Sequence, residues 1–82
     1  MQLFPRRLPK PIIDKIYIWI ELVERIGLPE TRKYSGFHDE PLRGDRAGQR
    51  SIRLNKGYRL FYIELPGHVI VLKVIEVNKH DY

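Results

Sequence analysis

The sequence contains no cysteine. Disulfide frameworks and thiolate metal sites are therefore excluded for this chain. A lack of cysteine agrees with a reducing compartment, where disulfides are rare. We accordingly expect a cytoplasmic protein.

Long apolar runs are also absent, since the longest are Ile16–Ile20 and Val69–Leu72. Both are far shorter than the roughly 20 residues that a membrane-spanning helix needs. The N-terminal residues lack the apolar core of a secretory signal. A chain of 82 residues is long enough for one domain with a modest core. We therefore expect a single domain over residues 1–82 and no membrane partner.

The motifs of several enzyme classes are missing as well. Ser51 has no nucleophile elbow around it, and the glycines form neither a Walker loop nor a dinucleotide fingerprint. Five residues could be drawn as metal ligands: His38, Asp39, Glu40, His80 and Asp81. Adjacent residues point in different directions, however, and no HExxH-type spacing occurs. We therefore expect no metal site and no cofactor.

Positive charge is concentrated in one part of the chain. The segment from Arg43 to Arg59 holds six bases and one acid, so it accounts for the whole net charge of +5. Five of the six bases are arginine, which binds phosphate through a planar two-point fork. The segment thus predicts a surface for a polyanion, with nucleic acid favoured over an acidic membrane. The alternative is a solvated strand edge guarded by charge. The candidate RNA-binding residues are Arg43, Arg46, Arg50, Arg53, Lys56 and, near the C-terminus, Lys79.

Hydrophobic periodicity predicts one long helix from residue 11 to 26. Its apolar residues recur at helical spacing and form one stripe: Ile12, Ile16, Trp19, Ile20, Val23 and Ile26. Gly27 and Pro29 end this helix, and residues 29–34 predict a second, short one. Residues 35–48, rich in glycine and polar residues, predict a long loop.

Alternating apolar and polar residues predict strands at 49–54, 58–65 and 68–77. Asn55 and Gly57, which tolerate positive φ, predict the tight turn of the first hairpin. The last strand is apolar on both faces, as in an inner or covered strand. The predicted fold is α+β with two layers, in which one long and one short helix pack on a small antiparallel sheet. The other face of the sheet is open, and Arg53 and Arg59 share it.

One set of residues fits metal-free cleavage of RNA. Such cleavage needs a base for the 2′-hydroxyl proton, cations for the crowded phosphorane and an acid for the leaving 5′-oxygen. The set comprises Glu40, Arg53, Arg59, His80 and Tyr82. Histidine can serve either proton role near neutral pH, and tyrosine can stack on a base. Taken singly, each residue also has a structural explanation, so the set as a whole supports this interpretation.

Four segments together resemble the RelE/ParE superfamily of bacterial toxins, and the RelE, YoeB and HigB messenger-RNA interferases in particular. The segments are Glu40–Gly44, Ala47–Leu54, Tyr58–Tyr62 and Val77–Tyr82. The resemblance implies a compact toxin that enters the ribosomal A site and cuts messenger RNA. It also implies a cognate, usually DNA-binding antitoxin, in a toxin–antitoxin hetero-oligomer or beside a toxin homodimer.

By position, the resemblance assigns roles to individual residues. Glu40 matches the acidic residue of YoeB-like members, and Arg59 matches their phosphate-binding arginine. His80 and Tyr82 match a histidine and a tyrosine near their C-termini, and Arg53 matches a basic strand residue. These matches imply catalytic roles for Glu40, Arg59, His80 and Tyr82.

The sequence departs from the family in two places. Family members begin with a strand before the first helix, and here that strand is missing or vestigial. Asp81 also separates His80 from Tyr82, which YoeB-like chains place together. Two alternatives to a nuclease therefore stay open. One is a non-catalytic toxin like the ParE gyrase inhibitors, and the other is a degenerate member that binds an antitoxin without cutting.

Overall fold

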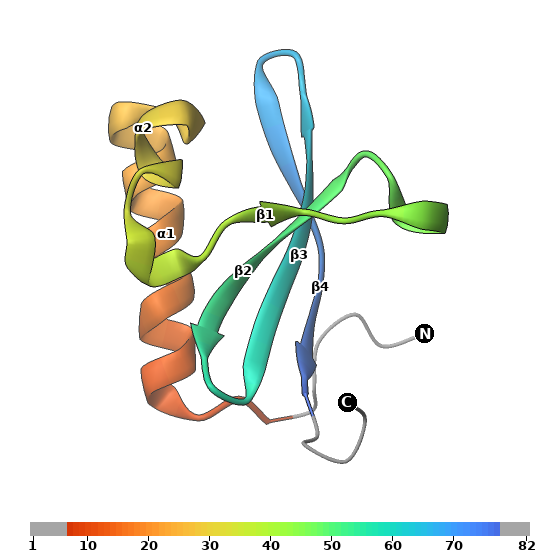
Figure 1. The fold of residues 1–82 in the computed structure, drawn as a ribbon. Coiled ribbons are helices and arrows are strands. Elements are labelled where there is room, and N and C mark those ends of the chain that lie inside the picture. Colours follow the sequence, from red (N-terminus) through yellow and green to blue (C-terminus); the bar gives the residue numbers. More distant parts are fainter. Residues whose placement is uncertain (1–6, 78–82) are drawn as a thin grey trace.

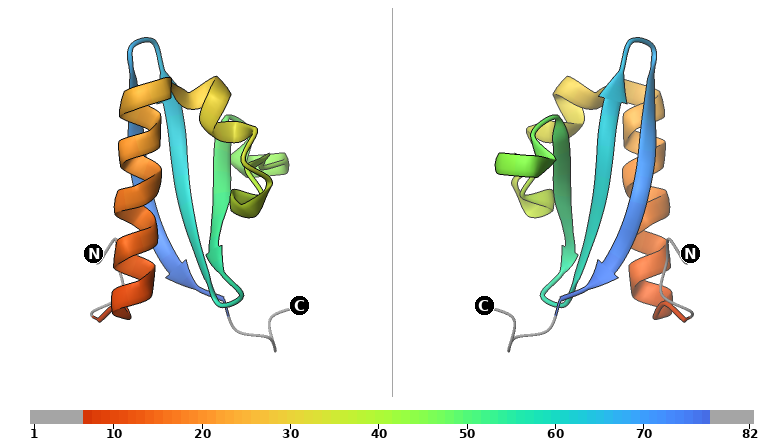
Figure 2. Two further views of the ribbon diagram at one scale, coloured as in Figure 1. Left: turned by 90° about the vertical axis from the view of Figure 1, so that its left-hand side faces the viewer. Right: turned by 90° about the vertical axis from the view of Figure 1, so that its right-hand side faces the viewer.

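The computed structural model describes residues 7–77, which form one sheet with the α-helices on one of its faces (Figures 1 and 2). The chain runs through these elements in order: α1 (Lys10–Ile26), α2 (Leu28–Arg32), the 3₁₀ helix η1 (Ser35–Phe37), β1 (Glu40–Pro41), the 3₁₀ helix η2 (Gly44–Arg46), β2 (Gln49–Asn55), β3 (Tyr58–Leu65) and β4 (His68–Glu76). Within the described residues, no helix is long and apolar enough to cross a membrane. The predicted two-layer α+β class is confirmed.

Helix α1 covers the sheet with the stripe that its periodicity predicts. Trp19 is buried on this face, and Ile16 and Val23 pack half-buried against the same core. Ile26 was predicted to belong to the stripe but is 41% exposed, because it lies at the end of the helix. Gly27 follows with φ 84°, and its N–H donates to the carbonyl of Val23. Glycine adopts this positive φ at little cost, which allows the sharp turn into α2.

The sheet is antiparallel with the order β1-β2-β3-β4. The predicted meander of three strands is confirmed, but the continuous loop predicted for residues 35–48 is wrong. Phe37 in η1 is buried in the core, and Glu40 and Pro41 pair with Ser51 and Arg50 as a fourth strand. A strand of two residues shows no alternation, so its sequence resembles a loop.

The turn between β2 and β3 lies where it was predicted, but another interaction forms it. Neither Asn55 nor Gly57 has a positive φ. Instead, the side-chain Oδ1 of Asn55 accepts a hydrogen bond of 2.7 Å from the N–H of Gly57. Asparagine side chains commonly support turns in this way.

Strand β4 was predicted to be either an inner strand or one covered by a partner. Among residues 7–77 it forms one edge of the sheet, so the first alternative is wrong and the second stays a prediction. Its register with β3 shifts at Leu72, because Phe61 pairs with Lys73 while Tyr62 pairs with Val71. Leu72 is therefore the extra residue of a β-bulge. Apolar side chains on both faces consequently stay partly accessible, and Ile70 is 41% exposed.

The core lies between α1 and the face of the sheet that α1 covers. Ile52, Leu60, Tyr62 and Val74 point from the three long strands toward the helix and are at most 1% exposed. The rings of Trp19 and Tyr62 meet with centroids 5.0 Å apart. Because side chains alternate along a strand, the residues between these four must project from the opposite face.

Candidate nucleic-acid interface and active site

The face of the sheet away from the helices is uncovered, as the right-hand view of Figure 2 shows. Alternation places the following side chains on this open face: Ser51 and Arg53 of β2, Arg59 and Phe61 of β3, and Lys73 of β4. Residues 42–48, with η2, project on the same side of the sheet (Figure 1). The predicted pairing of Arg53 and Arg59 on one open face is therefore confirmed.

Arg53 and Arg59 lie directly opposite each other in the ladder between β2 and β3. Nη1 of Arg59 donates a hydrogen bond of 3.2 Å to the hydroxyl of Ser51, and this partner is neutral. Neither arginine forms an ion pair with another residue in the range 7–77. Like charges directly opposite each other destabilise a sheet. The pair is therefore well suited to an anion that would neutralise both guanidinium groups.

Two more cations surround an aromatic ring on the same face. Phe61 is only 4% exposed. The guanidinium carbon of Arg46 lies 5.6 Å from its ring centroid, and Nζ of Lys73 lies 5.3 Å from it. Cation–π contacts hold both side chains over the sheet without neutralising their charge. The basic surface therefore extends from η2 across β2 and β3 to β4.

Glu40 is the carboxylate on the edge of this basic face. It is exposed and pairs with Ser51 across β1 and β2. Paired residues of an antiparallel ladder project to the same side. Ser51 therefore has Glu40 beside it on one strand and accepts a hydrogen bond from Arg59 on the other. One acid and two arginines thus project from the same side of neighbouring strands, an arrangement that suits proton abstraction beside a phosphate.

The residue before Glu40 is buried on the other side of the sheet. The carboxylate of Asp39 is 1% exposed and accepts hydrogen bonds from Nε of Arg50 at 2.7 Å and from the hydroxyl of Tyr62 at 2.5 Å. Nε of Arg32 lies 3.9 Å away, and the same guanidinium contacts Glu64 at 2.9 Å. We call Asp39, Arg50 and Tyr62 the Asp39 cluster. Arg50, a predicted RNA-binding residue, therefore has a buried carboxylate as its partner, on the helix side of the sheet.

Burial and the hydrogen bond to Asp39 raise the pKa of Tyr62 to about 12. An unperturbed tyrosine has a pKa of about 10. The folded state therefore holds this proton more tightly than the unfolded state does. The protonated hydroxyl of Tyr62 therefore makes its full contribution to stability below pH 10, and this contribution is lost as the pH rises through 12.

We expect the stability advantage of the intact chain over Tyr62→Phe to shrink by about 1–3 kcal/mol between pH 10 and pH 12, because each pKa unit corresponds to about 1.4 kcal/mol. Urea unfolding of both chains at several pH values would measure it. All other ionisable side chains are the same in both chains, so their contributions cancel in the difference. Parallel stability curves would contradict the proposed role of the Asp39 hydrogen bond.

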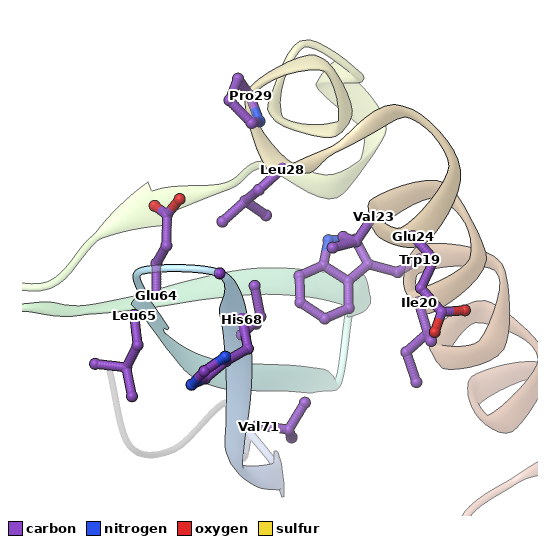
Figure 3. A pocket seen from close by; sticks show the side chains of 12 residues that line it. Trp19, Ile20, Val23, Glu24, Leu28, Pro29, Glu64, Leu65, His68 and Val71 are labelled. Atoms are coloured by element: carbon purple, nitrogen blue, oxygen red, sulfur yellow. The ribbon is translucent and has the colours of Figure 1, made fainter.

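A groove of about 640 Å³ lies between the C-terminal half of α1, α2 and the β3–β4 hairpin (Figure 3). Its apolar lining includes Trp19, Val23, Leu28 and Val71, with Glu24, Glu64 and His68 among the polar residues. The indole Nε1 of Trp19 has no hydrogen-bond partner among the described residues. No predicted site residue within residues 7–77 lines the groove, so in this part of the chain it is separate from the basic face.

The remaining predicted residues fall into two groups. Arg43 precedes η2 and Lys56 occupies the β2–β3 turn, and both are exposed. Lys79, His80 and Tyr82 lie outside the described residues. Among residues 7–77, no group of three histidine, aspartate or glutamate side chains could hold a metal ion.

Sequence reasoning missed two residues of this region. Lys73 lies outside the basic segment, and only the pairing of β4 with β3 places it beside Phe61. An alternation count from Phe61 through the β3–β4 turn could have found it, had the bulge at Leu72 been recognised. Asp39 was considered only as a metal ligand, and nothing in its local sequence indicates its partners.

Comparisons with known proteins place the fold. No family model matches the chain, and no curated protein matches it in sequence. Solved structures of similar fold include the following three. YafQ from E. coli strain BL21(DE3) is 15% identical, with a TM-score of 0.65 over 89% of this chain and 88% of that one. A YoeB/ParE toxin from Agrobacterium tumefaciens is 24% identical, with a TM-score of 0.66 over 89% and 81%. A YoeB dimer from Staphylococcus aureus is 19% identical, with a TM-score of 0.63 over 92% of both chains.

These likenesses confirm the RelE-like α+β fold that the sequence resemblance implies. Each neighbour covers most of this chain, so the helices and the sheet correspond as one unit. Chemistry does not follow from the fold, because one fold carries different functions.

Proposed function

We propose that this chain is the toxin of a toxin–antitoxin module and that it cleaves messenger RNA on the ribosome without a metal ion. One observation carries the proposal. Arg53 and Arg59 face each other without an ion pair in residues 7–77, and the open face presents Glu40 beside them. A RelE-like fold, shared with YafQ and YoeB, supports the same assignment.

In the proposed reaction, the carboxylate of Glu40 takes the proton of a 2′-hydroxyl. The oxygen attacks the adjacent phosphorus, and Arg59, helped by Arg53, stabilises the phosphorane. The bond to the 5′-oxygen then breaks, and that oxygen receives a proton from His80, a role that rests on the family resemblance. Tyr82 stacks on the RNA in this scheme. The products carry a 2′,3′-cyclic phosphate and a 5′-hydroxyl.

Five basic residues around the reacting phosphate would position the RNA: Arg43, Arg46, Arg53, Lys56 and Lys73. Compared with the set predicted from the sequence, Arg50 is left out because it is bound to Asp39, and Lys73 is added. Lys79 stays in the proposal on its sequence position alone. Phosphate contacts fix the position of a nucleic acid on the protein, whereas recognition of its sequence depends on contacts to the bases.

The proposed partner is an antitoxin, and the groove beside Trp19 is the surface we assign to it. The groove has a mainly apolar lining that includes Leu65 of β3, which is 38% exposed, and it borders the edge strand β4, where Ile70 is 41% exposed. An extended peptide could add to that edge and fill the groove with alternate side chains. A second copy of this chain is the alternative occupant, since one structural neighbour is a dimer.

Replacing Arg59 with alanine should lower the rate of message cleavage by about 10²–10³, because it removes a donor aimed at charge that develops in the transition state. Affinity for RNA should fall far less, since several other bases remain on the face. The measurement is cleavage on translating ribosomes, with growth of expressing cells followed in parallel. A second assay, on isolated RNA with EDTA present, tests whether cleavage needs a metal ion. The chelator is kept out of the ribosome assay because ribosomes themselves require Mg²⁺.

Equal toxicity of the intact chain and the Arg59→Ala chain would contradict the nuclease proposal. The second candidate is then a non-catalytic toxin, which the YoeB/ParE name of one neighbour favours. A gyrase inhibitor needs no acid–base pair, so its toxicity would survive the loss of Glu40 and come with no cleaved message. Two harmless, folded chains would instead indicate a member that only binds an antitoxin.

A further inference from the structure

The route of the chain around the edge of the sheet raises the question of what fixes Glu40. Residues 35–37 lie in the helix layer as η1, whereas η2 lies beyond the open face (Figure 1). Between them the chain crosses the edge of the sheet, and Glu40 lies at this crossing. Its own side chain is exposed and forms no hydrogen bond or ion pair with the rest of residues 7–77. Only the backbone can determine where its carboxylate lies.

The backbone at the crossing has little support of its own. Strand β1 has two residues. His38 has φ 46°, in the left-handed region that few residues other than glycine adopt. The segment from η2 to β2 is exposed on its far side. On the C-terminal side of the crossing, the support consists of the short β1 ladder and the hydrogen bond from the N–H of Leu42 to the carbonyl of Gln49, and on the N-terminal side of the buried Phe37. This support would still allow Asp39 and Glu40 to fray.

Asp39 supplies the missing anchor from behind the sheet. Its carboxylate is 1% exposed and binds Arg50 of β2 at 2.7 Å and Tyr62 of β3 at 2.5 Å. Arg50 and Tyr62 are themselves paired across the ladder. Both partners belong to the two central strands, and Tyr62 is fully buried against Trp19. A charge-assisted, buried contact of this kind holds its side chain in one geometry.

We propose that Asp39 is a positioning residue for Glu40, and that the Asp39 cluster fixes the carboxylate of Glu40 at the open face. The inference rests on the proposed role of Glu40 as the base in RNA cleavage. Adjacent residues of an extended chain project to opposite sides. An anchor at Asp39 on the helix side therefore presents Glu40 on the side of Arg53 and Arg59. Arg50 acts through the same contact and would not touch RNA.

The proposal predicts a specific kinetic effect for Asp39→Asn, which keeps the shape and removes the charge. The turnover number for message cleavage should fall by about 10-fold to 100-fold, because small misplacements of a reacting group are costly. The KM for ribosomes should change less than about twofold, since the basic face is untouched. Asp14→Asn removes the same charge from an exposed i, i+4 pair with Lys10 on α1 and serves as the matched control.

Double-mutant cycles separate positioning from a general loss of structure. If Asp39 acts through Glu40, then Asp39→Asn should slow cleavage no further once Glu40→Gln is present. Combined with Arg59→Ala, it should still multiply the defect, because Arg59 is held by Ser51. If Asp39→Asn only damaged the fold, its effect on the rate would multiply with that of Glu40→Gln as well as with that of Arg59→Ala. Circular dichroism and thermal unfolding verify that each variant is folded.

Full activity of folded Asp39→Asn, or multiplication with Glu40→Gln, would overturn the inference. If Asp39→Asn does not fold, Tyr62→Phe removes a single hydrogen bond of the same cluster, and the same two criteria apply to it. Failure of the proposed function is seen separately. In that case Glu40→Gln alone cleaves as fast as the intact chain, or the intact chain does not cleave, and the positioning role falls with it.

Discussion

Replacing Glu40 with glutamine should slow message cleavage by about 10²–10⁴, the usual contribution of a general base. Glutamine keeps the size and the polar character of the side chain but cannot take the 2′-hydroxyl proton. The variant should bind RNA at least as tightly, because one negative charge leaves a face with Arg53 and Arg59. Single-turnover cleavage on translating ribosomes would measure the rate, and an oligonucleotide titration would measure the affinity.

The matched control for this variant is Glu21→Gln. Glu21 is exposed on α1, in an i, i+4 pair with Arg25, and lies on the helix side of the sheet. It loses the same charge and should cleave at the rate of the intact chain. A Glu40→Gln chain that cleaves within about threefold of the intact chain would show that another group takes the proton, since the contribution of a base is far larger.

Replacing Trp19 with alanine should destabilise the domain by about 3–5 kcal/mol, the range for a buried aromatic residue. Trp19 is 2% exposed and packs against Tyr62 in the centre of the core. A domain of this length has a total stability of about 4–12 kcal/mol. The variant should therefore unfold at a much lower urea concentration, or be unfolded in buffer.

Far-ultraviolet circular dichroism is the suitable probe, because Trp19 is the only tryptophan. Ile18→Ala on the same helix is the control, since Ile18 is 52% exposed. Ile18→Ala should lower the free energy of unfolding much less than Trp19→Ala does, because exposed side chains contribute little to stability. Equal losses for Ile18→Ala and Trp19→Ala would mean that the helix presents a different face to the sheet.

The face of α1 and the shared face of Arg53 and Arg59 could be predicted from the sequence for a common reason. Both depend on short-range periodicity: 3.6 residues for the helix that carries Trp19, and two for the strands that carry Arg53 and Arg59. Asn55 and Gly57 fixed the position of the turn, although the hydrogen bond of Asn55 was not foreseen. The direct pairing of the two arginines depends on a further irregularity, because Asn55 pairs with Tyr58 and the register shifts between Arg53 and Asn55.

The contacts of Asp39 could not be predicted, because they join residues far apart in the chain. Arg50 and Tyr62 lie 11 and 23 positions away. Each belongs to a strand whose alternation is satisfied without Asp39. Strand β1 was missed for a related reason, since Glu40 and Pro41 form a strand only because β2 offers a free edge.

The bulge at Leu72 affects how readily copies of this chain without a bound partner would aggregate through β4. An edge strand with regular hydrogen-bonding groups can recruit other strands end to end and start an aggregate. The extra residue in β4 breaks the regular spacing in its middle. An incoming strand could therefore pair with residues 68–71 or 73–76, but not with the whole edge in one register. Short, specific peptides can still bind there, while long β-aggregates would meet a mismatch at every molecule.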